Sequence, residues 1–214
     1  MAGSLCGVWV DETGRIHTTI ATAHGGREQR LASLRPFAWL SASPADPAGA
    51  GLLVEKLSGE GLFDYLAHAD TLAAHVAFGR SDKPGINFDA IRPLEAQFLL
   101  QNRERLYREM TFSQLRRCQL DIEVASPAGG FPDASRPDDR VLAVGLRWGG
   151  QNRLLLLGEV SDAGEKALLQ EFCAALQEAD PDVIEGHNLF KFDLDYLRQR
   201  CRRHKIACAW GRYG

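Results

Sequence analysis

The sequence lacks the features that mark several large classes of protein. No apolar run reaches the roughly 18 residues that a membrane-spanning helix needs, so no span is predicted. Lys+Arg number 25 against 28 Asp+Glu, a net charge of −3, so the bulk basic excess of a nucleic-acid packaging protein is missing. No repeat or low-complexity tract occurs. With 45% hydrophobic and 25% charged residues, the composition is globular and excludes a disordered, collagen-like or coiled-coil chain.

Targeting and crosslinking signals are scarce as well. The N-terminus, MAGSLCGVWVDETG, has no basic stretch followed by an apolar run, so it is not a signal peptide. The five cysteines are odd in number and never spaced as Cys-x-x-Cys, which disfavours a disulfide framework or a thiolate zinc site. Reduced thiols therefore predict a cytoplasmic protein, associated with the nucleoid in a prokaryote. A length of 214 residues fits one large domain or two small ones.

The first half of the chain is predicted to be rich in β-structure. Short β-branched runs on both sides of a turn predict a hairpin from 6–10 and 15–23. Further strands are expected at 36–41 and 52–57. Leu62, Tyr65 and Leu66 have helical spacing and predict a short helix over 61–69, and a second helix is expected over 93–102.

The second half has a clearer rhythm. The predicted elements follow the order β-β-β-α-β-α-β, with strands at 115–124, 141–148, 153–160, 182–186 and 206–210 and helices at 165–179 and 192–204. This order predicts an α/β fold (α+β overall), a mixed sheet with helices on its faces. We place a domain boundary near residue 112, which divides the chain into a smaller β-rich N-terminal domain, 1–112, and a second domain, 113–214.

The candidate chemistry begins on the strand at 115–124. Side chains alternate along a strand, so Asp121 and Glu123 point the same way and Ile122 points into the core. Two carboxylates on one face are costly unless something compensates their charge. Hard divalent cations such as Mg²⁺ prefer such oxygen ligands. The alternative is an edge strand whose polar face is simply in water.

A second acidic feature lies at 180–197. A short apolar strand leads into Gly-His-Asn, and a helix then opens around Asp193. A carboxylate in a first turn is favoured by the helix dipole, which is one interpretation of Asp193. The other is a metal ligand at the carboxyl end of a strand, where open α/β sheets commonly place their sites.

These residues carry a resemblance to a known family. The segment 116–123 (RRCQLDIE) resembles the first exonuclease motif of the family B DNA polymerases, and 180–197 resembles the second, which reads Asp-Pro-Asp, Gly-aromatic-Asn, Phe-Asp. The stretch 99–115 resembles the lead-in to the first motif. The resemblance covers roughly 95–212 well, whereas 1–90 matches the N-terminal domain of the family only loosely.

The resemblance implies a 3′–5′ exonuclease with a ribonuclease-H-like fold and two divalent ions, Mg²⁺ or Mn²⁺. By carry-over of the motifs, Asp121 bridges both ions, Glu123 ligates one and Asp193 ligates the other. Asn188 and Phe192 match positions near the 3′ end of the substrate, although Phe192 also suits a core position. His187 stands where the family often has an aromatic residue, and either packing or a general-base role is open to it.

The family also has a fourth carboxylate, in a Tyr-x-x-x-Asp motif, which we do not find: Tyr196 is followed at that offset by Arg200. We therefore expect a chain truncated before the third motif, with weak or no nuclease activity alone. The implied partners are DNA, as a single-stranded 3′ end or primer-template, and the remaining polymerase domains, with no membrane. The alternatives are a non-catalytic nucleic-acid or protein-binding module of the same ancestry and a stand-alone exonuclease.

One basic cluster has no place in these motifs. Arginines, a histidine and a lysine crowd the segment 198–205 at the end of the last predicted helix. Cations there complement the helix dipole, so a solvated face is the first interpretation, and phosphate contact is the second.

Overall fold

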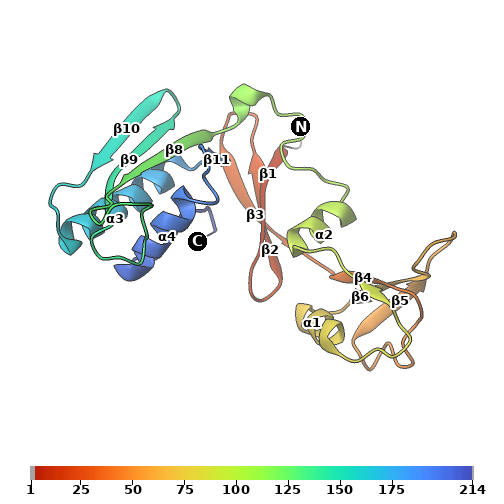
Figure 1. The fold of residues 1–214 in the computed structure, drawn as a ribbon. Helices are drawn as coiled ribbons and strands as arrows, with labels where there is room; N and C mark the ends of the chain where they lie inside the picture. The colour runs from red at the N-terminus through yellow and green to blue at the C-terminus, as the bar shows by residue number, and fades with distance from the viewer. Residues whose placement is uncertain (1–2, 214) are drawn as a thin grey trace. The chain divides into compact units, whose positions relative to one another are not determined.

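A computed structural model describes residues 3–213 and divides the chain into two units, 1–109 and 110–214 (Figure 1). Each unit has its own sheets and its own core and is described by itself. The assignment of 1–112 and 113–214 to the two domain types of the family remains a prediction.

The first unit opens with a three-stranded antiparallel sheet in the order β1-β2-β3, made of β1 (Ser4–Val10), β2 (Arg15–Ala21) and β3 (Arg27–Ser33). The predicted hairpin is confirmed by β1 and β2. In its turn Asp11 Oδ1 accepts hydrogen bonds from the backbone N–H groups of Thr13 (2.9 Å) and Arg15 (3.0 Å). The third strand, β3, has no apolar pattern because it is an edge strand with an exposed face, so the sequence did not reveal it.

A second sheet in this unit has the order β5-β6-β4-β7. Its strands are β4 (Phe37–Leu40), β5 (Leu52–Lys56), β6 (Tyr65–Ala69) and β7 (Phe88–Asp89), and helix α1 (Leu72–Arg80) packs on it. Leu40, Ala69 and Phe78 belong to its core. Helix α2 (Leu94–Gln101) packs its Phe98 in the core of the first sheet. Gln97, wholly buried on α2, accepts a hydrogen bond from the Phe37 N–H (2.8 Å) and donates one to the Ile91 carbonyl (3.0 Å).

The predicted helix over 61–69 is wrong. Residues 65–69 form strand β6, which pairs with both β4 and β5. The two-residue alternation that buries Ala67 and Ala69 decides the structure, whereas Leu62, part of the helical spacing, is exposed in a turn. Helix α1, which the sequence did not reveal, begins after Thr71, whose hydroxyl accepts from the Ala74 N–H.

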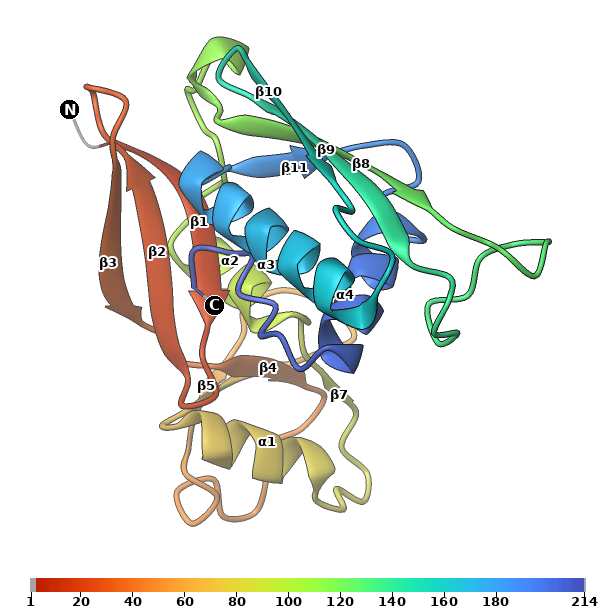
Figure 2. The same cartoon turned by 90° about the vertical axis from the view of Figure 1, so that its left-hand side faces the viewer.

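The second unit is a four-stranded mixed sheet with two helices. It contains a 3₁₀ turn η1 (Phe112–Gln114), strands β8 (Arg117–Val124), β9 (Val141–Trp148), β10 (Gln151–Leu156) and β11 (Val183–Glu185), and helices α3 (Asp162–Ala179) and α4 (Asp193–Arg203). The strand order is β10-β9-β8-β11, and only β11 runs parallel to its neighbour. This confirms the mixed α/β architecture and the order β-β-β-α-β-α (Figure 2).

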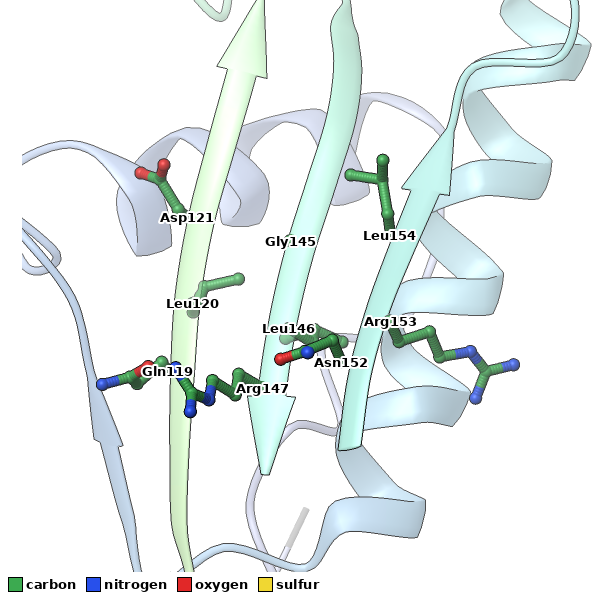
Figure 3. A pocket seen from close by; sticks show the side chains of 9 residues that line it. All are labelled: Gln119, Leu120, Asp121, Gly145, Leu146, Arg147, Asn152, Arg153 and Leu154. Atoms are coloured by element: carbon green, nitrogen blue, oxygen red, sulfur yellow. The ribbon is translucent and has the colours of Figure 1, made fainter. Parts of the chain in front are cut away.

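Both helices pack on the same face of this sheet. The face carries Leu120 and Ile122 of β8, which join the buried residues of α3 and α4, such as Phe172 and Leu197, in one core. The other face carries the alternate residues of β8 and β9, including Asp121 and the exposed Arg147 (Figure 3). Within residues 3–213, no helix is long and apolar enough to cross a membrane.

The predicted final strand at 206–210 is wrong, because these residues form no ladder with the sheet. Ile206, Cys208 and Trp210 alternate as they would in a strand, but they pack directly against the core beside the helices. The Trp210 indole meets Phe172 edge-on at 5.4 Å between ring centroids. The alternating apolar residues therefore mark the side of an irregular segment that packs against the core, and not a strand.

Candidate active site

The first pair of predicted site residues lies on the open face of the sheet. Burial alternates along β8, so Asp121 and Glu123 are exposed while Leu120 and Ile122 are buried. Across the ladder Asp121 lies opposite Gly145. Because a glycine projects no side chain, the space beside the Asp121 carboxylate stays open.

Asp193 reaches the site from a different element. It is the first residue of α4, and its exposed fraction is only 3%. Burial, and after it the negative charge of Asp121, raise the pKa of Asp193, although hydrogen bonds from the backbone of Asp193 and Ile122 oppose the rise. The charge of Asp121 on β8 therefore acts on the buried carboxyl group of Asp193 on α4.

A close backbone approach sets Asp193 beside β8. Directly after β11, a Cβ atom on Gly186 would lie 2.4 Å from the Leu120 carbonyl oxygen, so only glycine fits there. The chain then turns through Asn188, whose φ is 53°, and the buried Leu189 anchors the loop. The Phe192 N–H donates to the Asn188 carbonyl at 3.0 Å, which sets the start of α4.

The two residues predicted near the substrate have different surroundings. Asn188 is exposed in the turn. Phe192 is partly buried against the core, and its ring lies 5.3 Å from the rings of both Phe131 and Tyr196. Phe131, which is 76% exposed, was missed by the sequence reasoning. His187 is exposed, so the packing role is wrong; its charge instead contributes to lowering the pKa of Asp193.

A buried ionic network holds the loop that carries Phe131. Arg200 is fully buried on α4 and donates to the carbonyls of Ala134 (3.0 Å), Arg136 (2.6 Å) and Pro137 (3.2 Å). Its Nε donates to Glu165 of α3 at 2.8 Å. The interpretation of 198–205 as a wholly solvated face is therefore wrong at Arg200, where the folded loop supplies the partners.

Glu165 completes this network. Its carboxylate also accepts from the Val141 N–H at 2.9 Å and pairs with His204 Nε2 at 2.7 Å. Burial alone would raise the pKa of Glu165, but the hydrogen bonds from Arg200 and His204 outweigh it and lower the pKa. The Tyr196 hydroxyl donates to the Asp139 carbonyl at 2.7 Å. The loop between β8 and β9 is thus tied to the helix that bears Asp193.

The donor set fits a hard divalent cation in its chemistry. Asp121 and Asp193 are both carboxylates, and the charge of Asp121 raises the pKa of Asp193. Among the interactions that shift the pKa of the buried Asp193, the one cationic side chain is His187. Carboxylate oxygens are the ligands that hard divalent cations prefer. A complete cage is not formed: across residues 3–213, no group of three or more His, Cys, Asp or Glu side chains is placed to hold a metal ion.

A shallow hollow of about 400 Å³ lies on the open sheet face beside Asp121. Asp121, Gly145 and Leu154 form one row across the three strands, and Gln119, Arg147 and Asn152 form the next row (Figure 3). The hollow has the carboxyl group of Asp121 on one side and the guanidinium group of Arg147 on the other, whereas the guanidinium of Arg153 pairs with Glu171 and Glu178 of α3. This charge pattern lies directly across the sheet from the side on which α3 and α4 pack.

The sequence is similar to a known protein family and to several of its members. The sequence model of the family described as "DNA polymerase family B, exonuclease domain" matches residues 80–214. The bovine DNA polymerase delta catalytic subunit is 35% identical over 106 residues, which is 43% of this chain and 10% of that protein. A DNA polymerase of Archaeoglobus fulgidus is 28% identical over 117 residues, 55% of this chain and 14% of that protein.

The fold also matches a solved structure. The family B DNA polymerase from the hyperthermophilic archaeon Pyrobaculum calidifontis superimposes with a TM-score of 0.71 at 16% identity, over 98% of this chain and 33% of that one. The chain therefore spans 10% and 14% of the length of the two curated relatives and a third of the solved one.

Proposed function

This chain belongs to the family of exonuclease domains of the family B DNA polymerases, and on that premise we propose that it removes nucleotides from DNA 3′ ends. It acts as the proofreading 3′–5′ exonuclease portion of a larger polymerase. The observation that carries the proposal is the buried carboxyl group of Asp193, whose pKa the negative charge of Asp121 on β8 raises.

Asp121, Glu123 and Asp193 are the residues that we propose to hold Mg²⁺ or Mn²⁺. Bound there, two such ions would activate a water and offset the charge that builds on the scissile phosphate. The protein's own contribution is positional. The Ile122 backbone fixes the Asp193 carboxylate by a hydrogen bond, and β8 presents Asp121 and Glu123 on one side. The metal would also offset the local acidity that otherwise repels DNA.

The 3′ end of the DNA is proposed to lie against the loop side of this site. Phe131 offers an exposed ring, which meets the ring of Phe192 edge-on, and an exposed aromatic ring suits stacking on an unpaired base. Asn188, exposed in the turn before Asp193, is the residue that we propose to hydrogen-bond to the terminal nucleotide. Remaining polymerase domains are the proposed protein partners, and the reduced cytoplasm is the proposed compartment.

We expect weak hydrolysis from the 214 residues alone, because residues 3–213 do not assemble three ligating side chains. The test is digestion of a 3′-labelled single-stranded oligonucleotide with Mg²⁺ or Mn²⁺. Slow loss of the label that Asp121→Ala abolishes is the expected result. Asp195→Asn is the matched control, because Asp195 lies on the same helix but pairs with Arg198. Robust digestion by the unchanged chain would contradict the expected weak nuclease activity. Digestion that persists in Asp121→Ala would contradict the assignment of Asp121 to the active site.

A second candidate function is a nucleic-acid-binding module of the same ancestry that has lost catalysis. The observation that favours it is that the described residues, 3–213, hold no group of three side chains placed to bind a metal ion. It predicts that the chain binds the single-stranded 3′ end with the same affinity with and without divalent ions. No label would be lost at any Mn²⁺ concentration, whereas the nuclease proposal predicts metal-dependent loss.

A further inference from the structure

Three cysteines that are distant in sequence lie together beside the helices of the second unit. Cys173 is on α3, Cys201 is on α4 and Cys208 is in the segment after α4. All three are thiols. Cys201 is fully buried and its side chain hydrogen-bonds with the side chains of both Cys173 and Cys208. The other two are only partly buried, so the cluster extends from the core to the surface.

Cys173 has the surroundings of a reactive thiol. The Trp210 indole Nε1 donates a hydrogen bond to its sulfur at 3.3 Å, and the Cys201 thiol is a second donor. The hydrogen bond with Cys201 is the largest cause that lowers the pKa of Cys173 to about 7, against the opposing effect of burial. Donors directed at one sulfur stabilise the thiolate, which is the nucleophilic form of cysteine.

We propose that Cys173 is a site of oxidation by hydroperoxides and that Cys201 converts the oxidised sulfur into a Cys173–Cys201 disulfide. The thiol in contact with Cys173 is Cys201, whereas Cys208 contacts Cys201.

The chemistry takes place in two steps with hydrogen peroxide as the oxidant. The Cys173 thiolate attacks one peroxide oxygen; an S–O bond forms, the O–O bond breaks, and hydroxide leaves and is protonated to water. The Cys201 sulfur then attacks the sulfur of the Cys173 sulfenic acid. The S–S bond forms, the S–O bond breaks, and the oxygen leaves as water with the proton of the Cys201 thiol. In sum, two thiols and one peroxide give one disulfide and two waters.

The bond would join α3 to α4, the helix whose first residue is Asp193. A dithiol reductant would reverse it. Reversible disulfides of this kind are the form in which cysteine pairs occur in reducing compartments. The inference needs no metal and no DNA, so it does not depend on the proposed nuclease function.

The test uses the 214-residue chain, reduced and then treated with stoichiometric hydrogen peroxide. After trypsin digestion without reductant, the expected product is fragment 167–191 joined to a fragment that contains Cys201. Dithiothreitol should release it. Cys118→Ser is the matched control, because Cys118 is buried and its pKa is raised chiefly by that burial. Its cross-link should form as in the unchanged chain.

Two readouts keep the proposal testable if a cysteine variant folds poorly. In the unchanged chain, the alkylation of Cys173 by iodoacetamide should have its midpoint near pH 7, and Trp210→Phe should slow it severalfold at that pH. In Cys201→Ala, peroxide should leave Cys173 as a sulfenic acid that a cyclic dione traps. A bond between Cys201 and Cys208 instead, or a Cys173 that reacts no faster than Cys118, would overturn the proposal.

Discussion

The carboxyl groups of Asp121 on β8 and Asp193 on α4 lie close enough that the charge of the first raises the pKa of the second, beyond the larger effect of burial. The two residues are far apart in the chain and meet because Gly186 lets the backbone after β11 approach Leu120. A buried carboxylate next to a second carboxylate lowers the stability of the folded protein, because it is both desolvated and repelled. A bound cation would offset this loss of stability. The predictions below concern the two acids and the residues that position them.

The first prediction concerns Asp193 without divalent ions. Its raised pKa means that the folded state binds the proton more tightly than the unfolded chain does. The resulting stability is present in full below the unfolded value of 3.8 and is lost as the pH rises through the folded pKa. Asp193→Asn should therefore raise the melting temperature at pH 7 in EDTA, with a gain that fades below pH 3.8.

The measurement is thermal denaturation from pH 3 to pH 8, and Asp195→Asn is the control. The pKa of Asp195 is lowered, chiefly by its hydrogen bond with Arg198. This control should therefore gain nothing at pH 7. An Asp193→Asn protein that melts below the unchanged chain at pH 7 in EDTA would contradict the electrostatic account.

The second prediction concerns Arg200. Arg200→Ala leaves Glu165 buried without its main partner and frees three loop carbonyls, so we expect a loss of ~3–5 kcal/mol of stability. Arg198→Ala, at an exposed position two residues earlier on the same helix, should cost no more than ~0.5 kcal/mol. Urea denaturation followed by circular dichroism measures both, and equal costs would show that the buried network is not stabilising.

The third prediction concerns Phe131. If its exposed ring stacks on an unpaired base, Phe131→Ala should weaken binding of a single-stranded 3′ end by ~1–3 kcal/mol. Because the side chain is exposed, stability should change by less than ~0.5 kcal/mol. Fluorescence anisotropy with a labelled oligonucleotide checks it, against Leu62→Ala, which removes an apolar side chain of 87% exposure from the first unit. Unchanged affinity would remove Phe131 from the site.

The fourth prediction concerns Gly186. A methyl group there would lie 2.4 Å from the Leu120 carbonyl, so Gly186→Ala should push the loop off β8 and cost ~1–3 kcal/mol. The accompanying separation of the carboxyl groups should return the pKa of Asp193 towards its ordinary range, visible by NMR titration. Gly158→Ala, where nothing lies within 4 Å of the added carbon, should change neither quantity.

Local pattern was sufficient to predict the elements that carry the site. Alternation along 117–124 placed Asp121 on one face of a strand, and helical spacing predicted α3 and α4 to within three residues at each end. The pattern failed where partners come from elsewhere in the fold. The polar strand β3 is defined only by its pairing with β2.

The surroundings of two further residues depend on tertiary structure and could not be predicted from the local sequence pattern. Arg200 belongs to a run of cations that reads as solvated, and only the folded loop at 134–137 supplies the carbonyls that bury it. Phe131 lies in a turn-rich loop with no periodicity, and only folding brings it to Phe192. Both depend on contacts between segments about 60 residues apart.

The most direct test of the central claim, that Asp121 and Asp193 form a divalent-cation site, is Mn²⁺ binding measured by electron paramagnetic resonance. Free Mn²⁺ gives a signal that is lost on binding, so titration of the 214-residue chain reports occupancy without any need for catalysis. The account predicts weak but saturable binding that Asp121→Asn and Asp193→Asn each abolish and Asp195→Asn leaves intact. Equal binding by all four proteins, or none by the unchanged chain, would contradict it.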